Sequence, residues 1–229
     1  MRRTRRFRRI RRFVLRAILV VALIPPLWVA AYRWVDPPVT YLMAAEWARL
    51  GAVERSWRDL DAISPHLPLA TMGGEDARFC AHYGFDFEEI RKALAEEDRR
   101  RGASTLTQQV AKNAFLWPEA TWTRKGLEAG FALLIEAMWP KRRIMEVYLN
   151  VAEWDEGAFG AEAAARRYFG VSAADLTLRQ AALLAAILPN PKGRDAAGPS
   201  DFVARRAGAI ADGAETLRRN GGSDCLGLT

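Results

Sequence analysis

The stretch GGEDARFCAHYGFD, residues 73 to 86, places an acidic pair directly after a pair of glycines. An aromatic residue, one of the two cysteines and one of the two histidines follow within two helical turns. Glycine permits backbone conformations that other residues avoid, so the pair predicts a tight turn that presents a carboxylate. We therefore expect the turn to present the carboxylate of Glu75. Phe79, His82 and Asp86 should hold its turn to the domain, His82 through a structural hydrogen bond.

Around this stretch, apolar residues recur at the spacing of one helix face, and patterns that alternate in the manner of a strand are scarce. The segments begin at residues that commonly cap helices and end near glycine or proline. With 229 residues, half of them hydrophobic, the chain can bury one sizeable core, so we expect a mostly helical single domain with an appendage. The expected helices span residues 86–102, 104–115, 123–139, 141–149, 161–170, 177–188 and 200–219, with N-caps at Asp86, Ser104, Thr123 and Thr177. In the third of these helices, Leu127, Phe131, Leu134 and Ile135 should face inward.

The basic character of the chain lies at its N-terminus. The first twelve residues hold eight arginines and no acid, and removing these eight charges from the net charge of +7 leaves −1 for the rest of the chain. Nucleic-acid-binding domains carry their basic residues as a patch on a folded face. Because the remainder has no such excess of basic residues, we do not expect a nucleic-acid partner.

An uncharged segment from Ala17 to Tyr32 follows the basic tail, with aromatic residues gathered at its far end. A helix of this length, extended by apolar neighbours, can cross a bilayer. The positive-inside rule then predicts a cytoplasmic tail, a transmembrane anchor and an extracytoplasmic domain, over residues 1–12, 13–35 and 36–229.

The same segment has two further features. Pro25 and Pro26 should kink or break a helix, because proline lacks the N–H that the helix needs. The small residues from Val29 to Ala31 could also be the cleavage site of a signal peptide. The aromatic residues that crowd this site favour an uncleaved anchor over a signal peptide.

The two cysteines, Cys80 and Cys225, are too few for a disulfide framework and are wrongly spaced for a zinc site. An extracytoplasmic location permits one disulfide, but the glycine-rich tail around Cys225 argues against it. We expect no metal site built by the protein alone. Binding of a hard cation through carboxylates or through a substrate phosphate stays open.

Polar residues are concentrated in GASTLTQQVAKN, residues 102 to 113. Gln108 and Lys112 are four positions apart, so they share a helix face with Ser104, and Asn113 follows directly. Hydroxyl, amide and ammonium groups on one face suit a sugar that carries a phosphate. A helix face exposed to solvent would have the same pattern.

Charged residues in the next two segments extend this pattern. Arg124 and Lys125 lie in the first turn of a helix, where cations oppose the macrodipole, so an external anion is expected beside them. Glu146 lies in an otherwise apolar helix and faces either solvent or a cleft. With Glu75 it would form a carboxylate pair assisted by Lys112 and Arg124, a combination that suits glycosyl transfer.

Four motifs, EDARFCAHYGFD, GASTLTQQVAKN, RKGLE and KRRIMEVYLN, resemble in order and spacing the successive motifs of the peptidoglycan glycosyltransferases. The resemblance covers roughly residues 40 to 195, and the single anchor without a second catalytic domain is similar to the monofunctional members. It implies a lysozyme-like helical domain with a cleft over the membrane. It also implies the substrate lipid II, a disaccharide-pentapeptide on undecaprenyl diphosphate, which is polymerised with inversion into β-1,4-linked glycan during cell-wall synthesis.

The resemblance also implies residue roles. Glu75 takes the position of the general base that deprotonates the acceptor hydroxyl, and Glu146 that of a carboxylate near the donor diphosphate. Lys112 and Arg124 take the positions of cations that stabilise the leaving group. The side chains expected to bind substrate besides these are Ser104, Gln108, Asn113 and Lys125.

No cofactor is implied as required, although Mg²⁺ or Mn²⁺ could bind at the substrate diphosphate. The implied partners are lipid II, the growing glycan strand and the membrane, with proteins of cell-wall synthesis or division as further candidates. The implied location is the inner (plasma) membrane, with the catalytic domain in the periplasm. Three positions depart from the usual motifs: Ala103 replaces glycine, Met145 replaces leucine and Gln180 replaces glutamate.

The segment AFLWPEATW, residues 114 to 122, gathers aromatic residues around a proline between two motif helices. Such residues often form core, but in a membrane-tethered domain they suggest contact with lipid. We expect that contact from Phe115, Leu116, Trp117 and Trp122.

Two other classes of protein remain as alternatives. A lysozyme-like lytic enzyme would share the fold and a single acidic residue, but it would have no use for Lys112 and Arg124, because a glycosidic leaving group carries no diphosphate. A non-enzymatic membrane scaffold would need none of the four motifs. It would tolerate the change Glu75→Gln.

Overall fold

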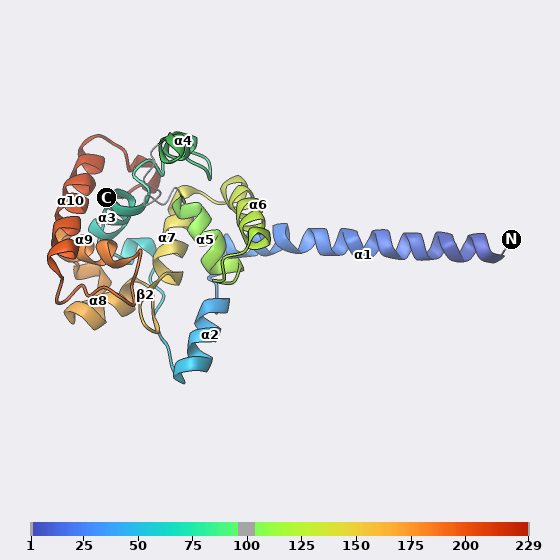
Figure 1. Ribbon diagram of the computed structural model, residues 1–229, viewed down its shortest axis with the longest axis horizontal. Helices are drawn as coiled ribbons and strands as arrows, with labels where there is room; N and C mark the ends of the chain where they lie inside the picture. Colours follow the sequence, from blue (N-terminus) through green and yellow to red (C-terminus); the bar gives the residue numbers. More distant parts are fainter. Residues whose placement is uncertain (1, 96–103, 229) are drawn as a thin grey trace. The chain divides into compact units, whose positions relative to one another are not determined.

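The computed structural model describes the backbone of residues 2–95 and 104–228, and the side chains in these ranges from residue 11 onward, except at positions 18 and 94. The chain forms two compact units, Met1–Asp36 and Pro37–Thr229. Helices dominate the described residues (Figure 1). The prediction of a mostly helical protein is therefore confirmed.

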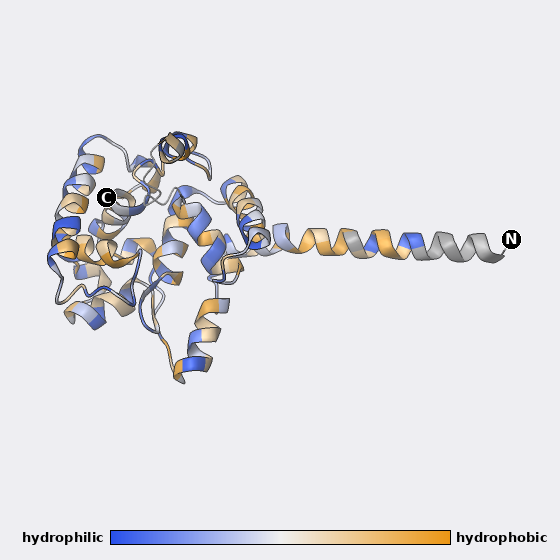
Figure 2. Cartoon of the chain, viewed as in Figure 1, coloured by the Kyte–Doolittle hydropathy of each residue, from blue (hydrophilic) through white to orange (hydrophobic). Residues whose placement is uncertain are grey.

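The first unit is the helix α1, Arg2–Tyr32. Its part from Arg11 to Tyr32 is 22 residues long with a hydropathy of 2.3, and it is orange over much of this length in Figure 2. Length and composition therefore fit a single-pass membrane anchor. The helix continues through Pro25 and Pro26, so the expected break is absent from this part of the described chain. Two missing N–H donors leave most of the hydrogen bonds of a long helix in place.

Nine helices are described in the second unit: α2 Tyr41–Leu50, α3 His66–Glu75, α4 Phe87–Ala95, α5 Leu106–Phe115, α6 Trp122–Met138, α7 Lys141–Val151, α8 Ala161–Phe169, α9 Leu178–Ile187 and α10 Asp201–Arg219. Short 3₁₀ turns lie at η1 Leu60–Ala62, η2 Ala173–Asp175 and η3 Asp224–Leu226. The helices α2 and α3 were not predicted. The predicted end of α4 at Gly102 and the departure at Ala103 lie outside the described residues.

A small sheet joins three short strands, β1 Glu54–Arg55, β2 Glu153–Asp155 and β3 Ala158–Phe159. Their order is β1-β3-β2, with β1 parallel and β2 antiparallel to β3. The register pairs Glu54 with Ala158 and Glu153 with Phe159. The sheet thus connects the segment after α2 to the segment after α7.

The core has two parts that matter for the site. In one part α9, buried from Ala181 to Ile187, packs against α3 and α10. In the other, α5 packs against both α6 and α7. From Ala181 to Ile187, α9 is apolar and appears orange in Figure 2, as expected for a helix surrounded by protein. The end of α3 and the face of α5 are therefore held by packing on several sides.

Two predicted N-caps are confirmed. The Asp86 carboxylate accepts hydrogen bonds from the backbone N–H groups of Glu88 and Glu89, at 3.0 and 3.1 Å. Thr177 and Gln180 form a reciprocal capping box at the start of α9. Gln180, which replaces the usual glutamate, therefore has a structural role through its amide oxygen.

Two other N-caps differ from the prediction. Helix α5 is capped by Thr105 in place of Ser104, because Thr105 forms a capping box with Gln108 and donates its hydroxyl to Gly84 O at 2.7 Å. Helix α6 is capped by Thr121 in place of Thr123. An N-cap needs an extended backbone, which Thr121 has, whereas Thr123 already lies inside the helix.

The buried face of α6 also differs from the prediction at its N-terminal end. Phe131 and Ile135 are buried as expected, but Leu127 is 43% exposed. Arg124 and Glu128 take the buried face instead, and they form an ion pair at 2.5 Å. Their spacing of four residues places them on the same stripe as the buried apolar residues of this helix.

The glycine pair before Glu75 does not form the predicted turn. Gly73 and Gly74 lie inside α3, and neither has a positive φ. A Cβ at Gly73 would lie 3.2 Å from the carbonyl oxygen of Ile210 and 3.2 Å from the amide nitrogen of Ala214, both on α10. The glycines therefore serve the close packing of two helices.

This packing leads to a prediction for stability. Gly73→Ala pushes a methyl group against the backbone of α10, and we expect the free energy of unfolding to fall by about 1–3 kcal/mol. Gly208→Ala on α10 is the control, because a Cβ there meets nothing within 4 Å. That change should stabilise by about 0.5–1 kcal/mol. The free energies of unfolding of both variants are measured by chemical denaturation. Equal free energies for Gly73→Ala and Gly208→Ala would contradict the packing argument.

Cys80 and Cys225 form a disulfide, with their Cα atoms 5.6 Å apart. The expectation that they stay apart is wrong. The glycines of the tail suggest a flexible segment. In the structure, however, Gly221 and Gly227 have positive φ values of 70° and 57° and form turns around η3. These turns return the chain to the domain, where Leu226 is fully buried.

Candidate active site

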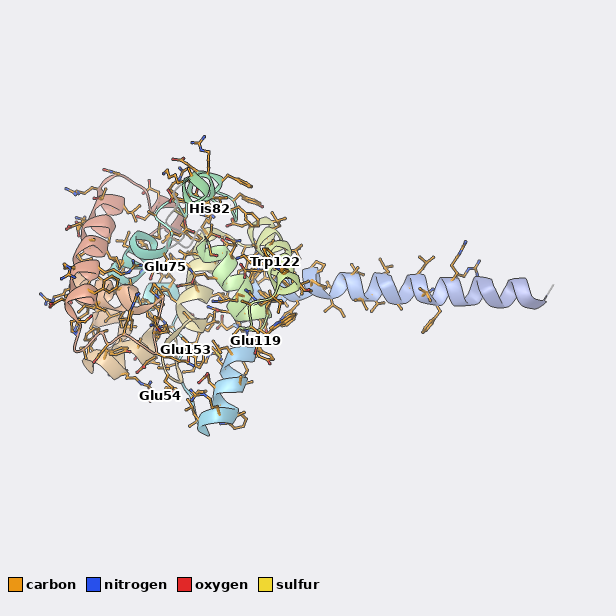
Figure 3. All side chains as sticks on the ribbon, viewed as in Figure 1. Glu54, Glu75, His82, Glu119, Trp122 and Glu153 are labelled. Carbon is orange, nitrogen blue, oxygen red and sulfur yellow. A yellow bond between two sulfur atoms is a disulfide. The ribbon has the colours of Figure 1, made fainter. Side chains whose placement is uncertain are left out.

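Glu75 is the last residue of α3 and faces the neighbouring helices with only 12% of its side chain exposed (Figure 3). One carboxylate oxygen accepts a hydrogen bond from Gln109 Nε2 at 3.1 Å, and the other lies 3.6 Å from Arg206 Nη2. Gln109 Oε1 in turn accepts a hydrogen bond from the Tyr148 hydroxyl at 3.2 Å. Residues of α3, α5, α7 and α10 therefore converge on this carboxylate.

The surroundings of Glu75 raise the pKa of its carboxyl group. Burial is the largest cause, and it outweighs the hydrogen bond from Gln109 and the positive charges of Arg206, Arg194 and Lys112. A carboxylate that binds a proton more readily than usual is suited to general base chemistry. The positive charges of Arg206, Arg194 and Lys112 oppose the shift by favouring the ionised form.

The second acid of the pair, Asp76, has a structural role. Its carboxylate accepts hydrogen bonds from Leu106 N at 2.9 Å and from His82 Nε2 at 2.9 Å. The expected structural hydrogen bond of His82 is thus confirmed. Phe79 is fully buried, with Lys141 Nζ 4.4 Å from its ring centre. Asp76 therefore fixes the start of α5 relative to the end of α3, and with it the position of Gln109 beside Glu75.

The polar residues predicted on one face of α5 differ in burial and in hydrogen bonding. Gln108 is buried in the capping box, so its amide oxygen is occupied by Thr105. Lys112 and Asn113 are half-buried on the same helix. Among the side chains that the structure describes, Lys112 has no hydrogen bond and no ion pair, and Glu128 and Glu75 act on it through charge alone. Burial lowers the pKa of Lys112, and the negative charges of Glu128 and Glu75 oppose that shift.

Arg124 and Lys125 share one carboxylate. Arg124 Nη1 pairs with Glu128 Oε2 at 2.5 Å, and Lys125 Nζ pairs with the other oxygen. Arg124 Nε also donates to Glu119 O at 2.9 Å, and Lys125 Nζ donates to Ser104 Oγ at 3.3 Å. The anion that the sequence suggested beside these cations is therefore Glu128 in the protein itself. Their contacts with a diphosphate stay a prediction.

Glu146 is directed at η1. Its Oε2 accepts a hydrogen bond from Leu60 N at 2.9 Å, and its Oε1 pairs with Arg143. One turn later, Asn150 accepts a hydrogen bond from Arg58 N at 2.8 Å and donates one to Arg58 O at 2.8 Å. Glu146 thus anchors the 58–60 backbone to α7. No described contact joins it to Glu75, so the proposed carboxylate pair and the role of Glu146 at the diphosphate stay predictions.

Four residues around the candidate site, Gln109, Glu128, Arg194 and Arg206, are not among the predicted site residues. Gln109 had a usable signal, because it precedes Lys112 by three positions and so shares its helix face. Glu128 is also recognisable from the sequence, because it lies four positions after Arg124 and three after Lys125, on the same helix face. Arg194 and Arg206 lie more than a hundred positions from Glu75, and no local pattern joins them to it.

The described residues contain no group of three or more His, Cys, Asp or Glu side chains that could hold a metal ion. Glu75 and Glu146 both have protein donors on their oxygens. A divalent cation would therefore need most of its ligands from the substrate diphosphate and water. That cation stays a prediction.

Comparison with known proteins gives consistent results. The profile of the family described as transglycosylase matches residues 43–215. A relative from Jannaschia sp. (strain CCS1) is 52% identical over 216 residues, covering 94% of this chain and 90% of its own. Relatives from Rhodospirillum centenum and Caulobacter vibrioides are 53% and 47% identical, covering 92% and 96% of this chain and 90% and 97% of their own. All three are named biosynthetic peptidoglycan transglycosylases.

Proposed function

Because the chain belongs to the transglycosylase family, we propose that it polymerises lipid II into β-1,4-linked glycan strands and releases undecaprenyl diphosphate. The observation that carries this proposal is the Glu75 carboxylate, 12% exposed and hydrogen-bonded to Gln109 of α5, the helix that also carries Lys112. The ammonium group of Lys112 has no hydrogen bond or ion pair among the described side chains. A base and a cation on adjacent helices are the two groups that transfer from a sugar diphosphate needs.

The proposed step is an in-line displacement. The acceptor hydroxyl attacks the anomeric carbon of the donor sugar, and Glu75 takes the hydroxyl proton. The bond from the anomeric carbon to the diphosphate oxygen breaks, and the electron pair leaves with the diphosphate. Lys112 neutralises part of the charge that develops there, and attack from the opposite face inverts the configuration at the anomeric carbon.

The other predicted residues are assigned around this step. Ser104, Asn113 and Lys125 would contact the sugar and phosphate groups at the ends of α5 and α6. Gln108 would act through the capping box that starts α5. Arg124 would act on the diphosphate and would orient Glu128, which also pairs with Lys125. Mg²⁺ or Mn²⁺ bound to the diphosphate would add further positive charge.

We also propose that the chain is a single-pass protein of the inner membrane with its catalytic domain in the periplasm. Eight arginines precede the apolar part of α1, which favours a cytoplasmic N-terminus. The Cys80–Cys225 disulfide supports an oxidising compartment for the domain, since cytosolic thiols are kept reduced. The growing glycan strand and the membrane would then be partners, along with proteins of cell-wall synthesis or division.

The aromatic segment before α6 contributes unequally to the proposed lipid contact. Phe115 and Leu116 are buried, and Phe115 stacks on Phe131 with ring centres 4.9 Å apart, so the expectation of lipid contact is wrong for these two. Trp122 is 93% exposed (Figure 3) and stays a candidate for the membrane surface.

Incubation of the detergent-solubilised full chain with labelled lipid II tests the proposed activity. We expect a ladder of polymer that a muramidase digests. Finished, lipid-free glycan incubated with the same protein should release no fragments. Fragments without polymer would replace the synthase with the lytic alternative, and neither product would contradict both enzymes.

A reporter fused after the last residue tests the topology. We expect an extracytoplasmic signal and a full-length protein in the membrane fraction. A soluble product beginning near Tyr32 would instead show that the N-terminal segment is a cleaved signal peptide.

A further inference from the structure

The last residues of the chain lie beyond the part that matches the transglycosylase family, which ends at residue 215. They are nonetheless packed into the domain, because Leu226 is fully buried and Cys225 is bonded to Cys80. We call residues 221–228 the C-terminal clamp. A free tail would have neither of these attachments.

The first attachment of the clamp is close to the proposed base. Cys80 lies five positions after Glu75, in the segment that follows α3. His82, two positions further on, donates a hydrogen bond from Nε2 to the Asp76 carboxylate at 2.9 Å. The Asp76 carboxylate also binds Leu106 N at the start of α5, the helix that carries Gln109. Cys80 is therefore joined along the chain to Glu75 and, through His82 and Asp76, to the start of the helix that carries Gln109.

The second attachment is to α7 and η1. Arg142 Nη1 on α7 donates to Leu226 O at 2.8 Å, and Arg142 Nη2 pairs with Asp61 at 2.5 Å. Asp61 belongs to η1, the same turn that Glu146 holds through Leu60 N. The clamp thus joins the segment after Glu75 to the helix that carries Glu146.

We propose that the C-terminal clamp, closed by the Cys80–Cys225 disulfide, is a positioning element for Glu75 and its donor Gln109 in the polymerisation reaction. This inference rests on the proposed function. The clamp touches no reacting atom. It acts by holding the segment after Glu75 in a fixed position relative to α7. Small displacements of catalytic groups have large effects on rate.

The test compares the full-length wild type with Cys225→Ser, Cys80→Ser and the double variant, with lipid II as substrate. We expect kcat per folded molecule to fall severalfold, within the roughly 10²-fold that a misplacement of about 1 Å can cost, while KM changes less than about twofold. Both single variants break the same bond, so the double variant should be no slower than either. A purely structural role would reduce the folded fraction and leave kcat per folded molecule unchanged.

Reduction of the folded wild type covers the case in which a serine variant does not fold. Treatment with a phosphine reductant should lower kcat to the level of the variants, and reoxidation should restore it. The double variant, treated in the same way, should not respond. An unchanged kcat in folded, reduced wild type overturns the clamp while the proposed function stands. An oxidised wild type that forms no polymer overturns both.

Discussion

Glu75→Gln should lower the polymerisation rate of the purified protein by about 10²–10⁴-fold, the usual contribution of general base catalysis. The change keeps the shape of the side chain, and the amide oxygen can still accept the hydrogen bond from Gln109. It removes the carboxylate beside Gln109 and Arg206 that would take a proton from an acceptor hydroxyl. The rate is measured with labelled lipid II under single-turnover conditions.

The same variant should fold normally. Burial raises the pKa of Glu75, so the ionised carboxylate is held at some expense in free energy, and its removal should leave the melting temperature equal or higher. Glu54→Gln is the matched control, because Glu54 is exposed on β1 and pairs with Arg167 (Figure 3). That control should keep the wild-type rate. A Glu75→Gln protein that polymerises at the wild-type rate would remove Glu75 as the base.

The pH dependence of the wild type follows from the same pKa shift. The base form of Glu75 is the ionised carboxylate, so the rate falls as the pH drops through its pKa. Because burial raises that pKa above the ordinary value of 4.5, the acidic limb of kcat/KM should lie above pH 4.5. The Glu75→Gln variant should lose this limb.

Lys112→Ala should reduce polymer synthesis by a factor of about ten or more, because a charge-assisted hydrogen bond to the leaving diphosphate contributes about 1.5–3 kcal/mol. Lys112 carries this expectation because no described residue pairs with it, whereas Arg124 and Lys125 are already bound to Glu128. Lys92→Ala, on the exposed face of α4, is the control with the same loss of charge.

Arg124→Ala provides a contrast with Lys112→Ala. Its removal leaves Glu128 buried with one cation fewer, so we expect a loss of stability in addition to a loss of rate. Lys112→Ala should lower the rate with little change in stability. If Lys112→Ala left synthesis intact and the wild type cleaved lipid-free glycan, the lytic alternative would be supported.

The amino-acid sequence by itself determined the helical class, most helix positions and the family. These depend on local patterns: apolar residues at helical spacing, cap residues, and motifs in order. The capping box of Thr177 and Gln180 and the cap at Asp86 were predictable for this reason, since each involves residues within three positions. The basic tail and the apolar segment after it were equally local.

Only the tertiary structure decided which partners several of the predicted residues have. Gly73 was read as part of a turn, but its neighbours are backbone atoms of α10 more than a hundred positions away. The chemistry of glycosyl transfer suggests a pair of Glu146 with Glu75, but Glu146 accepts a hydrogen bond from the backbone N–H of Leu60 in η1. The Cys80–Cys225 disulfide closes across 145 positions. A carboxylate, a glycine or a thiol has several possible partners of similar energy, and the packing of distant helices selects among them.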